Sequence, residues 1–189
     1  AGDRAAFEPL EKAAALVPMV TGENTPHLIM ARLAEKLGDS ARAISEYQAV
    51  LAQDHTTVEP ARSLAALAEK ASLQQPLMRA WERVVAIDPF DPQAHAGLGR
   101  LALKSRQPDT AVREFKAALA IGPADKASAH CDLAEAYLLA NRPADAKVEA
   151  LAALEIAPSF DRAQDLLLQA IKNTGTAVGA ASAAGGGGK

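Results

Sequence analysis

Basic side chains recur at a matched interval in this chain, and their chemistry suits the binding of carboxylates. Lys36, Lys70 and Lys104 are 34 residues apart, and an arginine precedes each by one or two helical turns. A guanidinium can make two parallel hydrogen bonds to a carboxylate, so this series could hold an acidic peptide or a chain terminus. The candidate binding residues are Arg32, Lys36, Arg62, Lys70, Arg100, Lys104 and Glu135. A solvated helix surface is the competing interpretation, because Glu35 and Glu69 adjoin two of the lysines.

Three of the four histidines raise the question of a metal site. His27, His95 and His130 occupy equivalent places in the repeat described below. Packed helices lie about 8–10 Å apart, so places two helices apart are separated by on the order of 15–20 Å. Zinc ligands must all lie about 2 Å from one ion. We therefore predict a packing role for these histidines, with no shared metal and no cofactor.

The sequence contains no recognisable catalytic constellation. Cys131 stands beside Asp132 and outside any basic cluster that would favour a thiolate, so we expect a plain, partly buried thiol. Neither a Gly-x-Ser-x-Gly elbow, nor a phosphate loop, nor a dinucleotide fingerprint is present. We predict that the chain is not an enzyme.

Composition narrows the classes of partner. Hydrophobic residues make up 49% of the chain but aromatic residues only 4%, which favours closely packed helices. A net charge of −3 disfavours nucleic-acid binding through a basic field, and a single cysteine excludes an internal disulfide framework. No apolar run approaches the roughly 18 residues of a membrane span, and no signal peptide is visible. We expect a soluble bacterial protein, with the choice between cytoplasm and periplasm left open.

A repeat of 34 or 35 residues must position the basic side chains. Each repeat carries two apolar segments at helical spacing, which predicts an all-α solenoid of antiparallel helix pairs. The predicted parts are a half repeat containing only a second helix (1–20), four full repeats (24–57, 58–91, 92–126 and 127–160), a capping helix (161–173) and a flexible Gly/Ala-rich tail (174–189). His55 stands where other repeats close with proline, so we expect a looser junction there.

The prolines support this division. Proline is tolerated in the first turn of a helix and just beyond its end, but not in its interior. Ten of the eleven prolines fall at such places in the two-helix repeat, and the awkward one is Pro9. The agreement indicates that the helix boundaries follow one rule along the whole array.

The repeated residues resemble the tetratricopeptide repeat family, in a bacterial-type array. The resemblance lies in the pairs Met30-Ala31, Leu64-Ala65, Leu98-Gly99 and Leu133-Ala134, in Ala43, Ala111 and Ala146 (Leu77 departs), and in Tyr47, Trp81 and Phe115 (Ala150 departs). It implies a right-handed superhelix whose concave face, lined by first helices, receives a peptide or a partner helix. The carboxylate clamp of the chaperone-binding members is absent, since Leu28, Arg32 and Arg62 stand at its places.

These observations predict a protein–protein interaction scaffold that binds a peptide or partner protein on its concave face. Two alternatives remain open. The sequence starts in mid-repeat and with Ala1, not Met, which suggests the C-terminal accessory region of a larger bacterial enzyme. The unpaired first helix instead suggests self-assembly into a homo-oligomer through exposed repeat ends.

Overall fold

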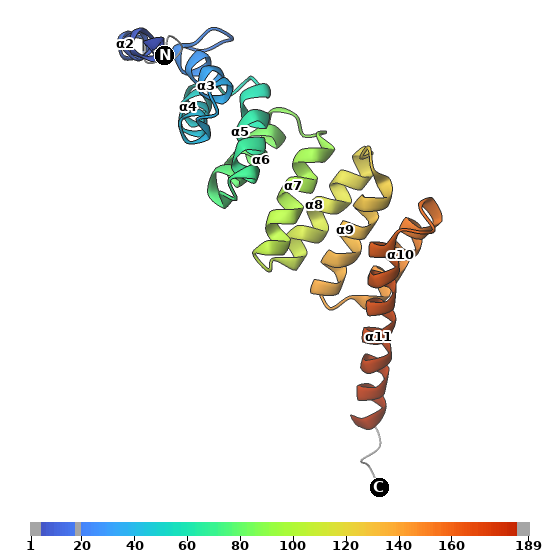
Figure 1. Cartoon of the computed structure of the whole chain (residues 1–189). Coiled ribbons are helices and arrows are strands. Elements are labelled where there is room, and N and C mark those ends of the chain that lie inside the picture. The colour runs from blue at the N-terminus through green and yellow to red at the C-terminus, as the bar shows by residue number, and fades with distance from the viewer. Residues whose placement is uncertain (1–4, 18–19, 185–189) are drawn as a thin grey trace. The chain divides into compact units, whose positions relative to one another are not determined.

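The computed structural model describes residues 5–17 and 20–184, in which ten helices and no strand are found. The helices are α2 (Phe7–Leu16), α3 (Pro26–Lys36), α4 (Ser40–Gln53), α5 (Glu59–Lys70), α6 (Gln74–Ile87), α7 (Pro92–Lys104), α8 (Pro108–Ile121), α9 (Lys126–Leu139), α10 (Pro143–Ile156) and α11 (Asp161–Ala184) (Figure 1). They divide into an N-terminal half (Ala1–Asp91) and a C-terminal half (Pro92–Lys189), which we describe separately. The predicted all-α solenoid fold is confirmed.

The same turn joins the two helices of every full repeat. Its central residue has a left-handed backbone, with φ of 74° at Gly38, 56° at Ser72, 53° at Arg106 and 56° at Asn141. The next backbone N–H returns to the carbonyl five residues earlier, as in the bonds Asp39 to Ala34 and Gln107 to Ala102. These two features define a Schellman ending, which satisfies carbonyls that the first helix leaves open. Only the first of the four turns uses the residue that this geometry favours, glycine.

Small residues let the two helices of a repeat approach closely. Ala31, Ala65 and Ala134 are fully buried. A Cβ placed on Gly99 would lie 2.6 Å from the Phe115 ring, so only glycine fits against this side chain in its present position. Gly99 and Phe115 therefore pack directly against each other, because the ring occupies the space that a methyl group would need.

Helix α2 packs on the rest of the N-terminal half through Phe7, with Leu10 and Ala14 beside it. Phe7 is buried with Met30, Ala34 and Ala43. The guanidinium of Arg42 stacks 3.6 Å above the Phe7 ring, an attractive cation–π arrangement. Pro9 is the third residue of this helix, so its missing N–H falls in the first turn, where no intrahelical partner exists. Pro18 lies outside the described residues.

Two expectations about helix ends need correction. The last helix does not end at residue 173 but continues to Ala184, because residues 177–184 are rich in alanine, the strongest helix former. The junction at His55 is not loose. Asp54 accepts hydrogen bonds from the backbone N–H and the hydroxyl of both Thr56 and Thr57, at 2.7–3.3 Å. These bonds hold the pKa of Asp54 at about 2.

Candidate functional site

The predicted binding arginines of the N-terminal half form ion pairs with the following part of the array. Arg32 Nη2 on α3 lies 3.1 Å from Glu59 Oε2 on α5. Arg62 on α5 donates from Nε to Asp91 Oδ2 at 3.2 Å, just before α7 begins. Both arginines are exposed, yet their charges are already compensated by carboxylates of this chain. The Arg32–Glu59 pair is exposed at both ends and contributes at most about 1 kcal/mol to stability, whereas Asp91 is buried.

The C-terminal half also joins successive first helices through ion pairs, one with the same polarity and one with the charges exchanged. Arg100 Nη1 on α7 lies 3.7 Å from Asp132 Oδ2 on α9. Arg162 Nη2 on α11 lies 2.7 Å from Asp132 Oδ1 and 2.8 Å from Glu135 Oε2. Glu135 and Arg162 are 27 residues apart, as are Arg32 and Glu59, so one position pair carries the same interaction with opposite polarity. Arg162 was missed in the sequence, where only the spacing of 27 could have revealed it.

The three predicted lysines differ from the arginines. Lys36, Lys70 and Lys104 are exposed in the last turns of α3, α5 and α7. None of them forms an ion pair with any residue that the structure describes. A lysine in the last turn complements the negative end of the helix dipole, which gives these residues a structural role. Their ammonium groups nevertheless remain accessible to a partner.

Each of the three histidines pairs with a glutamate on the second helix of its own repeat. The Nδ1 to Oε2 distances are 2.8 Å for His27–Glu46, 2.8 Å for His95–Glu114 and 2.7 Å for His130–Glu149, and the partners are always 19 residues apart. An ionised carboxylate only accepts hydrogen bonds, so Nδ1–H is the donor. The histidines therefore link helices through polar pairs, which refines the predicted packing role. The repeat 58–91 has fully buried Ala61 and Ala80 at these two places.

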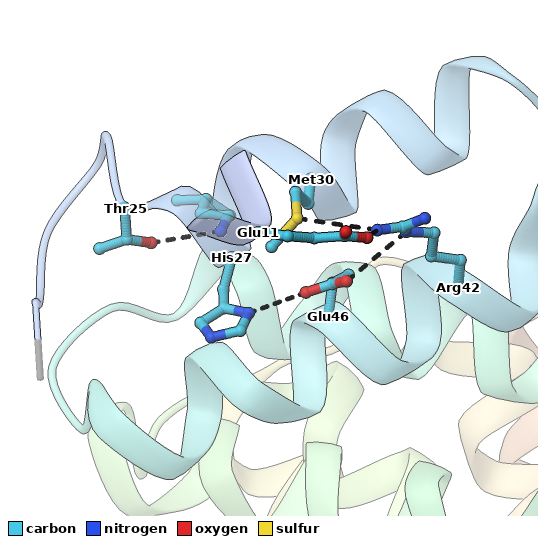
Figure 2. A network of polar contacts seen from close by, with 7 residues as sticks. Glu11, Thr25, His27, Met30, Arg42 and Glu46 are labelled. Atoms are coloured by element: carbon cyan, nitrogen blue, oxygen red, sulfur yellow. Dashed lines mark hydrogen bonds and ion pairs between the residues drawn. The ribbon is translucent and has the colours of Figure 1, made fainter. Parts of the chain in front are cut away.

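The first of these pairs belongs to a larger network around Arg42 (Figure 2). Figure 2 shows His27 and Arg42 approaching Glu46 from two sides. Arg42 Nε lies 3.6 Å from Glu46 Oε1, and the same guanidinium binds Glu11 on α2. The network thus connects α2, α3 and α4, which explains why Arg42 is only partly exposed.

Hydrogen bonds and burial shift the pKa values of two groups between paired helices, Glu114 and Tyr47. Burial opposes ionisation of Glu114, but hydrogen bonds from His95 and Arg113 outweigh it and lower the pKa of Glu114. Burial raises the pKa of Tyr47 to about 12, and the hydrogen bond that its hydroxyl donates to Glu35 adds to the effect. Both arrangements favour the charge states that keep the helix pairs together: an ionised glutamate and a neutral tyrosine.

Cys131 lies in the core and not on a binding surface. Its side chain is fully buried in the C-terminal half, where burial raises the pKa of the thiol. His130 precedes it in the chain, but the imidazole pairs with Glu149. Among the described residues no group of three or more histidine, cysteine, aspartate or glutamate side chains could hold a metal ion.

A pocket that the sequence analysis did not find opens in the N-terminal half. It has a volume of about 390 Å³ and lies between α4, α5 and α6, against residues of the second helices. Arg79 and Arg83, one turn apart on α6, line it together with Leu51 and Leu64. Because the predicted site was restricted to first helices, the sequence signal of two arginines at spacing four was overlooked.

Solved structures of other proteins have a similar architecture. No protein-family model and no curated protein sequence matches the chain. The solved structure of MamA is 21% identical and covers 79% of this chain and 81% of its own, with a TM-score of 0.70. YrrB, described as "a TPR protein with an unusual peptide-binding site", is 15% identical and covers 88% and 93%, with a TM-score of 0.61.

The fold is that of a tetratricopeptide repeat protein. A third structure agrees, the first such domain of Spaghetti (RPAP3) bound to the HSP90 peptide SRMEEVD. It is 15% identical and covers 64% of this chain and 98% of its own, with a TM-score of 0.58. Along the described part of this tetratricopeptide array, no helix has both the length and the apolar content needed to cross a bilayer.

Proposed function

We propose that this chain is a non-enzymatic protein–protein interaction scaffold that binds a peptide or a partner protein. The observation that carries the proposal is the tetratricopeptide fold itself, repeated in stacked helix pairs. Such repeats form a continuous surface from residues of successive helices. Two of the similar structures are described by their peptide complex or peptide-binding site, which supports the same use of the fold here.

The first helices supply the proposed binding surface. Lys36, Lys70 and Lys104 repeat at one position of α3, α5 and α7 and have no ion-pair partner among the described residues. Arg32, Arg62 and Arg100 lie on the same helices, but carboxylates of the chain already neutralise them. The lysines are therefore the better candidates to attract an acidic segment of a partner, while the arginines and Glu135 mainly join successive repeats.

Charge reversal on the first helices tests the proposal. Binding partners would be selected from a synthetic peptide library with the wild-type chain, and their affinity measured by fluorescence anisotropy. We expect Lys36→Glu with Lys70→Glu to weaken binding at least about tenfold, because two attractive charges become repulsive. Lys147→Glu, an exposed change on the second helix α10, is the matched control and should change affinity less than twofold. Equal effects of the two variants would contradict the proposed surface.

Self-association is a second candidate, favoured by one observation. Helix α11 leaves Leu168 and Ile171 exposed, at 55% and 48% of their full surface. These residues are three apart and so share one face of the helix. Sedimentation velocity over a hundredfold range of concentration, with Leu168→Glu as the variant, tests this candidate, and a constant monomer would rule it out. The role as an accessory region of a larger enzyme stays a hypothesis from the sequence alone.

A further inference from the structure

The pocket in the N-terminal half combines an apolar base with two cationic groups. Leu51 on α4 and Leu64 on α5 are almost completely buried, at 7% and 1% exposure, and they provide its apolar part. Arg79 and Arg83 on α6 provide the charge. The volume of about 390 Å³ falls within the range of roughly 300–1,000 Å³ that is usual for sites that enclose a ligand.

Neither arginine of this pocket has a carboxylate partner among the residues that the structure describes. Arg83 donates to the carbonyl oxygen of Leu51 at 3.2 Å and lies against Nδ1 of His55, which fixes its position without neutralising it. Arg79 has no ion pair with any described residue. The other arginines on the described helices all pair with carboxylates: Arg32, Arg42, Arg62, Arg100, Arg113 and Arg162. The two uncompensated guanidinium groups of the helices therefore meet at one pocket.

The repeat does not require arginine at both of these places. Every full repeat has a second helix with two equivalent places. In the other repeats these places are occupied by Ser45 and Ala49, by Arg113 and Ala117, and by Val148 and Ala152. One other repeat has an arginine at the first place, Arg113, and no other full repeat has one at the second. The pair of arginines is confined to this repeat, and arginine is one of the residues enriched where proteins bind one another.

We propose that this pocket binds an acidic segment of a partner protein, as a second site separate from the lysines of the first helices. One carboxylate of the segment pairs with Arg79 and Arg83, and a neighbouring apolar side chain covers Leu51 and Leu64. Glu82 also lines the pocket, so its net charge is only about +1, which favours a single carboxylate over a doubly charged phosphate. The proposal rests on the proposed scaffold function only in taking a protein as the partner.

A defined set of peptides tests the pocket with the full chain. Fluorescein-labelled peptides of nine residues would carry one Glu and one Leu, from adjacent to four apart, in a neutral Ser/Gly background. A matched set replaces Glu with Gln. We expect at least one Glu peptide to bind, its Gln counterpart to bind at least about tenfold more weakly, and added salt to weaken the binding of the Glu peptide.

Substitutions then assign the binding to the pocket. Arg79→Gln removes a charge without breaking any ion pair between described residues, and should weaken the binding of the Glu peptide about tenfold. Ala52→Glu adds a repulsive charge at the rim and should do the same. Arg106→Gln is the matched control, since Arg106 lies in the turn after α7 and outside the pocket, and should leave affinity within twofold.

Several results would overturn the inference. The first is that none of the peptides binds at millimolar concentration, and the second is that Arg79→Gln and Arg106→Gln have equal effects. The third is that inorganic phosphate competes with the peptide at a lower concentration than acetate does. The fourth is that the chain self-associates and Arg79→Gln abolishes this self-association. Loss of binding in Lys36→Glu with Lys70→Glu, but not in Arg79→Gln, would overturn this site and leave the proposed function intact. The reverse pattern would support the pocket and contradict the first-helix surface.

Discussion

The repeats 58–91 and 92–126 have different pairs of side chains at two equivalent places of their helix pairs. In the second of them, His95 on α7 and Glu114 on α8 meet across the helix pair at 2.8 Å. In the first, the equivalent places hold Ala61 and Ala80, each fully buried. A polar pair and a small apolar pair both satisfy the site, because each leaves no buried group without a partner. The fold therefore accepts either two polar side chains that bind each other or two small apolar side chains at these places.

The same two repeats differ in what they offer to a partner. The repeat 58–91 has Arg79 and Arg83 at the pocket, on its second helix, without carboxylate partners in the described part of the chain. The repeat 92–126 has Arg113 and Ala117 at these places, and Arg113 binds Glu114 at 2.8 Å. Positions that pack against the partner helix thus vary only in matched pairs, whereas positions on the outer surface vary freely. The latter are where recognition can differ between repeats.

The largest expected effect comes from breaking the match in the repeat 58–91. Ala80→Glu places a carboxylate against Ala61 in a fully buried site and should destabilise the chain by about 3–5 kcal/mol. Adding Ala61→His should recover at least about 1 kcal/mol, because the pair of the neighbouring repeat is then restored. Urea unfolding followed by circular dichroism measures both. Strictly additive losses in the double variant would show that the places are not coupled.

The reverse exchange should cost less. Glu114→Ala removes the acceptor of the bonds from His95 Nδ1 and from Arg113, and should lower the free energy of unfolding by about 1–3 kcal/mol. The double change His95→Ala with Glu114→Ala reproduces the alanine pair and should cost less than the sum of the single changes. A double-mutant cycle from urea titrations gives the coupling energy. A coupling energy of zero would contradict the view that the two residues form a unit.

Acidification should remove the contribution of Asp54 to the stability of its repeat junction. The folded pKa of Asp54 is about 2, below its ordinary value of 3.8, so its contribution is fully present above pH 3.8 and is lost as the pH falls towards 2. It amounts to about 2 kcal/mol at neutral pH. The difference in unfolding free energy between wild type and Asp54→Asn should shrink across this range. Hydrogen bonds from Ser128 also lower the pKa of Asp125 in the junction after α8, so the difference between wild type and Asp125→Asn should shrink on acidification too. A difference that does not change with pH would contradict the assignment.

The smallest expected effect concerns the turns. Arg106→Gly removes a side chain from a left-handed backbone and should raise the free energy of unfolding by about 0.5–1 kcal/mol. Gly38→Ala, the opposite change in the equivalent turn, should lower it by about 1–2 kcal/mol. Thermal unfolding resolves both signs. The same sign in the two variants would show that the turns are not equivalent.

Residue types alone were sufficient for the helices and their close approaches. Proline at Pro26, Pro92, Pro108 and Pro143 begins helices as expected, and the small partner of Phe115 is Gly99. The left-handed turns at Ser72 and Arg106 could not be predicted, because neither residue favours this backbone and tertiary packing of the two helices imposes it. The length of α11 was underestimated, since glycines in its sequence suggested a flexible tail.

The pairing of charged groups could not be predicted from the sequence. Arg32, Arg62 and Arg100 were predicted to meet a partner, and the structure places carboxylates of the chain beside them. Histidines at equivalent places were recognised, but not their glutamates 19 residues later. Charged side chains are long, and their neighbours across helices depend on the register between repeats, which apolar periodicity leaves undetermined.

The sequence by itself determined the period, the helix pairs and the residues at which helices touch, because these follow from apolar spacing, proline and small side chains. Only the tertiary structure decided which charges are neutralised and which remain available. It brought carboxylates to most arginines and left Arg79 and Arg83 beside an apolar pocket. The physical reason is that burial is set by local pattern, whereas compensation of a charge depends on which side chains the folded chain places around it.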